Sequence, residues 1–250
     1  MVIFQELEPI LAGAPENEAN LPTSFLKHFR LATEFYNAGD FRKALGEIEA
    51  AISLGPNYPE AHNNRGVALR RYLGQHEEAL AAYERAIELR PDYAEAHYNR
   101  GVALANLERY EEALVAFGRA IELRPDFVEA HYNQGLALGK LERYEEALEA
   151  YERTLVLCPD LVEAHNNLGD ALYHLKRYRE ALMAFERALA LRPGYAQARD
   201  NRRITLEQLL LDLVRRGIVS WRGGKPKGLD PPIVLTPGPT AAEIVIKDRR

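Results

Sequence analysis

The chain has 250 residues, of which 47% are hydrophobic and 28% are charged, and its formal net charge is −5 at pH 7. A chain of this length and apolar content can bury a large core, and it has no run of about eighteen apolar residues that would indicate a membrane-spanning helix. The single cysteine, Cys158, excludes an internal disulfide, which suits a reducing compartment.

Residues 1–24 are predicted to be an acidic segment that precedes the folded array. The segment contains prolines and lacks the basic start and long apolar run of a secretory signal peptide. We therefore expect a soluble, cytoplasmic protein that binds no membrane.

From residue 25 onwards the sequence repeats itself. In the third copy, small and apolar residues recur at helical spacing from Ala113 to Ile121, which predicts an amphipathic helix. A second helix is expected before it, from Glu95 to about Leu107. An Arg-Pro-Asp sequence then ends the copy, because proline removes a backbone donor and disfavours helix at the residue before it. The closing prolines are 35, 34, 34 and 34 residues apart: Pro56, Pro91, Pro125, Pro159 and Pro193.

The order of small and aromatic residues in these copies resembles the tetratricopeptide repeat (TPR). The matching residues are Gly66, Gly101, Gly135 and Gly169, then Ala79, Ala113, Ala147 and Ala181, then Tyr83, Phe117, Tyr151 and Phe185. This resemblance implies an all-α fold, a right-handed superhelical solenoid of helix-turn-helix units. The predicted units are 25–58, in which Ala32 replaces the glycine, 59–93, 94–127, 128–161 and 162–195.

The C-terminal part of the chain differs from the repeats in pattern and in charge. Residues 196–217 are predicted to form an amphipathic capping helix with a net charge of +2, and residues 218–250 form a basic tail of +3 with Pro and Gly turns and two short β-like runs. Residues 1–195 therefore carry −10, which argues against nucleic-acid binding by the repeats. The tail is expected either to contact an acidic partner or to fold back onto the repeats.

One asparagine recurs at the same place in the first helix of successive units. A carboxamide can both donate to and accept from a peptide backbone, so the row predicts capture of an extended peptide along one face. It is similar to the asparagine row in the repeat domain of O-linked N-acetylglucosamine transferase, which implies binding with little sequence preference. The alternative is that each carboxamide bonds to the adjacent helix. The row consists of Asn64, Asn99, Asn133, Asn167 and Asn201.

Residues that vary between units on the same face are expected to set specificity. The middle of the face is half apolar and suits an apolar side chain or a helix face, although ordinary variation of a surface without a ligand is the alternative. The residues of this set are Tyr98, Tyr132, Val102, Leu136, Asp170 and Tyr173.

A row of histidines also recurs, but successive units hold the rings too far apart to share one metal ion. We therefore expect packing with a hydrogen-bonded ring nitrogen, and no bound metal or other cofactor. The row is His28, His62, His97, His131 and His165.

The tail resembles the C-terminal arms of some bacterial antitoxins in the words "VSWRGGKP" and "AAEIVIKDRR". That resemblance implies that Arg249 and Arg250 enter the acidic site of a toxin or enzyme. Trp221, the only tryptophan, lies in the same basic arm and is expected to anchor it on a partner. An unrelated extension is the alternative reading.

No Gly-rich phosphate loop, metal-ligand cluster or nucleophile-base pairing is evident in the sequence. We therefore expect a non-catalytic scaffold that binds an extended or helical segment of another protein along the repeat face. The alternative is an antitoxin-like regulator that inhibits a toxin or nuclease through its C-terminal arm.

Overall fold

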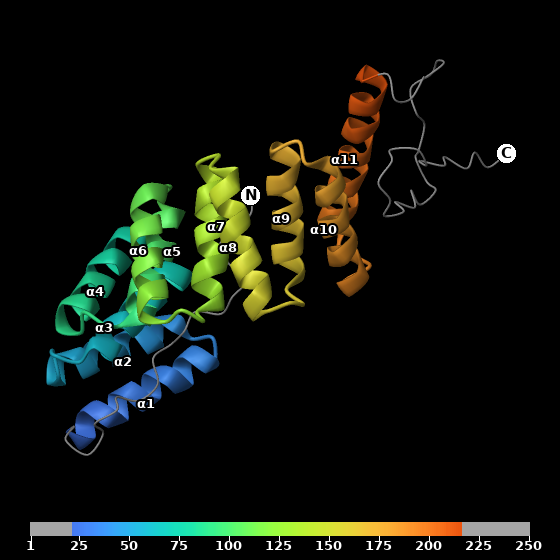
Figure 1. Ribbon diagram of the computed structural model, residues 1–250. Helices are drawn as coiled ribbons and strands as arrows, with labels where there is room; N and C mark the ends of the chain where they lie inside the picture. The colour runs from blue at the N-terminus through green and yellow to red at the C-terminus, as the bar shows by residue number, and fades with distance from the viewer. Residues whose placement is uncertain (1–21, 217–250) are drawn as a thin grey trace. The chain divides into compact units, whose positions relative to one another are not determined.

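The computed structural model describes residues 22–216, and within this range the chain is all α-helical, as predicted. The helices follow one another in pairs joined by short turns (Figure 1). They are α1 (Thr23–Asn37), α2 (Phe41–Leu54), α3 (Pro59–Leu73), α4 (His76–Leu89), α5 (Ala94–Asn106), α6 (Tyr110–Leu123), α7 (Val128–Lys140), α8 (Tyr144–Leu157), α9 (Val162–His174), α10 (Tyr178–Leu191) and α11 (Ala196–Arg215).

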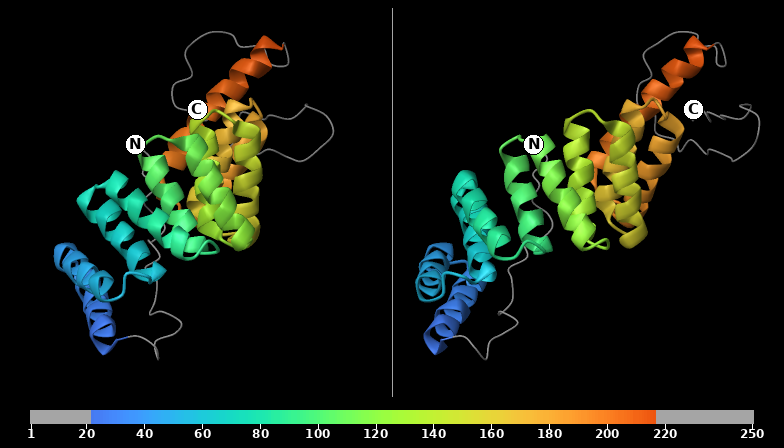
Figure 2. Two further views of the ribbon diagram at one scale, coloured as in Figure 1. Left: turned by 90° about the vertical axis from the view of Figure 1, so that its left-hand side faces the viewer. Right: turned by 60° about the vertical axis from the view of Figure 1, so that its left-hand side comes forward.

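The chain divides into two compact units, residues 1–164 and 165–250, with the division inside α9. In the first unit each helix packs on the next along the chain, from α1 to α8. The first helices of successive pairs also touch, since α5 contacts both α3 and α7 (Figure 2). In the second unit α10 packs on α11. This consecutive helix-turn-helix packing is that of a TPR solenoid, which confirms the predicted fold class for the described residues.

A glycine opposite an aromatic ring sets the close approach of the two helices in a pair. At Gly101 an added Cβ would lie 2.6 Å from a ring carbon of Phe117, and Gly66, Gly135 and Gly169 show the same relationship. In the first pair Ala32 occupies the glycine position, and the buried residue opposite is Ile48 in place of an aromatic ring. The smaller aliphatic side chain leaves room for the extra methyl group.

The helix α11 begins like a further repeat, but Arg203 stands at the glycine position. Its guanidinium is exposed and lies 3.1 Å from the carboxylate of Glu207, one turn further along. An arginine here would prevent a second helix from packing as closely as in the other pairs. The helix therefore carries a charged side chain where the first helices of repeats two to five have the glycine that lies against an aromatic ring.

The turns inside the pairs use residues with a left-handed backbone. Glu108, Glu142 and Lys176 have φ values of 60°, 58° and 59°, although they are not glycines. At the first of them, the N–H of Arg109 donates to the carbonyl of Leu104 over 2.9 Å, which closes a Schellman-type helix end. Backbone hydrogen bonds thus hold the left-handed conformation of the turn, although a residue with a side chain, such as Glu108, disfavours it.

Candidate functional site

The candidate site is the face of α3, α5 and α7 that carries the asparagine row. Asn64, Asn99 and Asn133 are all buried on this face, whereas Asn167 and Asn201 in the second unit are half-buried. The carboxamides of the first unit therefore lie within the packed array and do not extend into solvent.

Three asparagines of the row donate to the residue at one particular place in the preceding repeat, whereas Asn64 and Asn167 accept from the residue before them on their own helix. Asn99 Nδ2 donates to Asn63 Oδ1 over 2.9 Å, and Asn133 Nδ2 donates to the Tyr98 hydroxyl over 2.8 Å. In the second unit Asn201 Nδ2 donates to Asn166 Oδ1 over 3.2 Å. Of the two roles considered from the sequence, peptide capture and a bond to the adjacent helix, these three carboxamides make the bond to the adjacent helix.

The sequence singled out the position of these acceptors as one that sets ligand specificity, and did not predict its hydrogen bonds to the next repeat. The three acceptors each stand one residue before the asparagine of their own repeat, and Tyr132 occupies the same position in the fourth repeat; the acceptors are Asn63, Tyr98 and Asn166. Every one of these side chains has an oxygen that can accept a hydrogen bond. This shared acceptor oxygen is the feature of the sequence from which the bonds between repeats could have been predicted.

The bond between repeats engages only the amide nitrogen of Asn99, so its carbonyl oxygen, Oδ1, receives no hydrogen bond from it. Asn99 is 0% exposed, and its Oδ1 has no hydrogen-bond partner among residues 22–216. A buried carbonyl oxygen without a donor is costly, and most such atoms in folded proteins are paired. Asn99 Oδ1 is therefore a buried acceptor that the packing of residues 22–216 leaves without a donor.

The predicted specificity residues fall into two groups. Tyr98 and Val102 are buried with Val67 in one core cluster, and Tyr98 packs on the ring of Phe127 with centroids 4.9 Å apart. Tyr132 is also buried and its ring packs on that of Tyr151. By contrast Leu136 is half-buried, Tyr173 is half-buried and Asp170 is exposed.

A cation lies on the same face in the second repeat. Arg70, on α3, is 8% exposed, and its Nε donates to the Tyr83 hydroxyl over 3.4 Å. Burial raises the pKa of both Tyr83 and Tyr98, so the phenols beside Arg70 are neutral at physiological pH. Among residues 22–216 no carboxylate forms an ion pair with Arg70.

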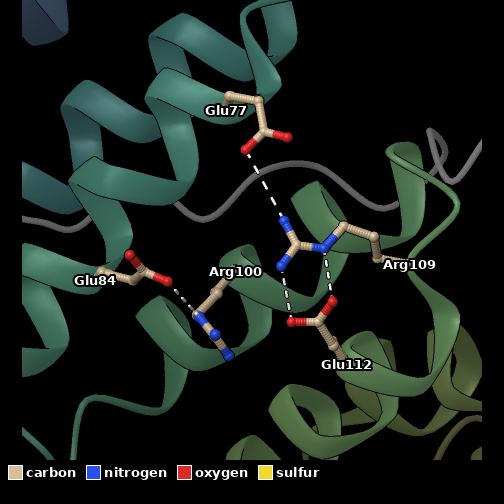
Figure 3. A network of polar contacts seen from close by, with 5 residues as sticks. All are labelled: Glu77, Glu84, Arg100, Arg109 and Glu112. Carbon is tan, nitrogen blue, oxygen red and sulfur yellow. Dashed lines mark hydrogen bonds and ion pairs between the residues drawn. The ribbon is translucent and has the colours of Figure 1, made fainter.

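Other arginines in the same part of the chain are paired. Figure 3 shows Arg109 with its guanidinium bonded to both carboxylate oxygens of Glu112 at 2.7 Å and lying 3.9 Å from Glu77 on α4. Arg100 on α5 likewise donates to Glu84 of the preceding pair. These exposed ion pairs connect neighbouring pairs on the surface, where each is expected to contribute little stability.

Three histidines of the row bond to backbone carbonyls, as predicted, and His28 lies 2.6 Å from a carboxylate oxygen of Glu47. The Nε2 atoms of His62, His97 and His131 donate to the carbonyls of Pro56, Pro91 and Pro125 over 2.8, 3.0 and 3.0 Å. Burial lowers the pKa of His62 and of His97. The prediction of a hydrogen-bonded ring nitrogen is confirmed for these three residues.

The predicted partner-binding arm, with Trp221, Arg249 and Arg250, lies outside the described residues. In the range 22–216 the structure places no group of three or more His, Cys, Asp or Glu side chains where they could hold a metal ion. No helix within that range combines the length and apolar character needed to cross a membrane.

Family models match most of the repeat array. A model described as "Tetratricopeptide repeat" matches residues 29–71, 115–162 and 132–196, which together cover half of the chain, and a second model of that description matches 94–127. A model described as "TPR repeat" matches residues 69–108. The chain therefore belongs to the tetratricopeptide repeat family. No curated protein is a significant match to the sequence.

Solved structures of the same fold include MamA, with 25% identity, a TM-score of 0.62, and coverage of 70% of this chain and 94% of that protein. MamA from Desulfovibrio magneticus RS-1, from residue 41 to its end, has 23% identity, a TM-score of 0.65, and coverage of 70% and 98%. YrrB, described as a TPR protein with an unusual peptide-binding site, has 22% identity, a TM-score of 0.62, and coverage of 70% and 90%. Together with the family, the comparisons support a protein-interaction scaffold with a protein or peptide partner, and they give no support to a toxin or enzyme partner.

Proposed function

We propose that this protein is a non-catalytic cytoplasmic scaffold that binds an extended or helical segment of a partner protein along the helix face of Asn64, Asn99 and Asn133. The bound segment lies against α3, α5 and α7. This assignment keeps the predicted face and revises the role of its asparagines.

The observation that carries the proposal is the buried, unpartnered Oδ1 of Asn99 beside apolar side chains. Its Nδ2 donates to Asn63 Oδ1 and its own Oδ1 is left without a donor, and in this proposal the bound segment supplies one backbone N–H. One such bond contributes only about 0.5–1.5 kcal/mol. Most of the binding free energy would come from apolar contacts with residues such as Leu136 and from a few well-packed anchors.

The asparagine row has a second task in this proposal. Its inter-repeat bonds hold neighbouring first helices in register, so that side chains from separate repeats meet one ligand. YrrB, a TPR protein of similar fold, is described as having an unusual peptide-binding site, which supports peptide binding by this fold, and no residue role is transferred from it.

The experiment is selection from a random peptide library, followed by affinity measurements with charged substitutions. Leu136→Glu places a charge on the proposed face and should weaken a selected peptide by at least about tenfold, because a carboxylate would be desolvated against an apolar ligand. Val115→Glu is the matched control, since Val115 on α6 is 71% exposed and lies outside the face. Equal affinity for both variants would exclude this face.

A further inference from the structure

The helix α11 packs with one side and leaves apolar side chains exposed on the other. Leu209 and Leu213 are 6% and 4% exposed and form a core cluster with Leu182 of α10. On the opposite side of the helix, Ile204 and Leu211 are 39% and 52% exposed. These two residues are seven apart, which is about two helical turns, so their side chains lie one above the other. The exposed side of α11 therefore has apolar surface that its own packing does not use.

Two opposite charges stand at the ends of this apolar surface. Asp200 lies four residues before Ile204, and helical spacing places them on the same side of α11. Arg215 lies four residues after Leu211 on that side as well. Both charged side chains are exposed, and within residues 22–216 neither forms an ion pair. We call these four residues the outer strip of α11, which runs from an acid through two apolar side chains to a base.

The outer strip is complementary to itself when its direction is reversed. Ile204 and Leu211 are equally far from the midpoint of the strip, and so are its two charged ends. We propose that the outer strip binds the outer strip of a second copy of this chain, antiparallel and about a two-fold axis. Ile204 of each copy then faces Leu211 of the other, and Asp200 faces Arg215 at both ends. A parallel pair would bring like charges together at both ends.

The charges near the centre of the pair are compatible with this arrangement. Glu207 stands beside the two-fold axis, so the two Glu207 carboxylates approach each other. Each of them lies 3.1 Å from the guanidinium of Arg203 on its own helix, which offsets the repulsion. Asp212 is likewise paired with Arg216 over 2.9 Å. The acidic residue of α11 that has no ion-pair partner within residues 22–216 is thus Asp200, which the second copy would supply with one.

The contact is small, so the expected dimer is weak and reversible. A 20-residue helix is about 30 Å long, and one such helix from each copy buries less than the roughly 800 Å² per partner of a standard interface. We expect a Kd on the order of 100 µM. The inference does not depend on the proposed function, because α11 lies outside α3, α5 and α7. Together with that function, a dimer would present two peptide-binding faces to one partner.

The test is sedimentation equilibrium of the full chain at concentrations up to about 500 µM, several times the expected Kd. The wild type should show a monomer–dimer equilibrium, and Leu211→Glu should weaken it by at least about tenfold, because a carboxylate would be desolvated in the contact. Met183→Glu is the matched control, since Met183 on the neighbouring helix α10 is 64% exposed and lies outside the outer strip. It should leave the Kd unchanged. Circular dichroism checks that both variants keep their helical content.

Charge exchange tests the antiparallel register. Asp200→Arg or Arg215→Asp alone places like charges together at both ends, so each should weaken the dimer by about five- to tenfold. An equimolar mixture of the two single variants should associate like the wild type, because each copy then meets the opposite charge at both ends. The double variant, with both substitutions in one chain, should also recover the wild-type Kd.

Three results would overturn the inference. They are a wild-type chain that stays monomeric at the highest concentration, a Kd that is unchanged in Leu211→Glu, and a mixture of the two charge variants that associates no better than either alone. The proposed function is tested separately, because Leu136→Glu should leave the dimer Kd unchanged and Leu211→Glu should leave the affinity for a library-selected peptide unchanged.

Discussion

The carboxamide of Asn99 donates a hydrogen bond of 2.9 Å to the carboxamide of Asn63, and this bond joins the first helices of two successive repeats. Both side chains are fully buried. The asparagine row is therefore part of the packing between repeats, and any contact with a ligand depends on the atoms that this packing leaves without partners.

Asn99→Ala should destabilise the chain by about 1–3 kcal/mol, because it removes the inter-repeat bond and leaves Asn63 Oδ1 buried without its donor. Chemical denaturation followed by circular dichroism measures the change. The control is Asn37→Ala, at the exposed end of α1, which should change the free energy of unfolding by no more than about 0.5 kcal/mol. Equal effects of the two substitutions would mean that the Asn99–Asn63 bond adds no stability.

Gly101→Ala should destabilise the third repeat by about 1–3 kcal/mol, because the new methyl group would overlap the ring of Phe117. Adding Phe117→Ile should recover part of that loss, since Ala32 and Ile48 make this combination in the first repeat. A double-mutant cycle measures the coupling. Gly118→Ala is the matched control: nothing lies within 4 Å of its added Cβ, so it should stabilise α6 by up to about 1 kcal/mol.

Glu108→Gly should stabilise the chain by about 0.5–1 kcal/mol. The left-handed backbone at this residue, with φ of 60°, costs a side-chain-bearing residue roughly 1–2 kcal/mol, and glycine avoids that cost at the expense of some unfolded-state entropy. Glu149→Gly, at an exposed position inside α8, should have the opposite sign and cost about 1 kcal/mol. Thermal melts of the two variants distinguish them, and a shift in the same direction for both would contradict the strain argument.

The melting temperature should fall as the pH is lowered from 7.5 to 5.5. Burial lowers the folded-state pKa of His62 and His97, with nearby arginines acting in the same direction. Their contribution is therefore complete above the unfolded-state pKa of about 6.5 and is lost as the pH falls through the lower folded-state value. The double variant His62→Gln with His97→Gln should melt with a flatter pH dependence. An unchanged slope would assign the pH effect to other groups.

Removing residues 218–250 tests the arm that contains Trp221, Arg249 and Arg250. Because the proposed face lies on α3, α5 and α7, the shortened chain should bind a library-selected peptide with the affinity of the full chain. Loss of that binding on removal of the tail would favour the arm hypothesis. The Leu136→Glu variant of the full chain serves as the reference for loss of binding at the face.

The repeat pattern was sufficient to predict the helices and their pairing. A proline that ends each copy, and a glycine opposite an aromatic ring, act within one helix pair, and such local constraints can be read along the chain. The hydrogen-bonded ring nitrogens of His62, His97 and His131 were predictable for the same reason, because each ring and its acceptor carbonyl are only six residues apart.

Local sequence patterns could not predict which polar side chains on the face of α3, α5 and α7 bond to each other and which remain without a partner. Asn63 and Asn99 are 36 residues apart, and whether their carboxamides meet each other or a ligand depends on how far one helix is turned against the next. The burial of Arg70 without a carboxylate depends likewise on which groups surround it in space. Sequence by itself determined the repeating helix pair, because its constraints are local, whereas only the tertiary structure decided which polar atoms are already paired, because those partners come from different repeats.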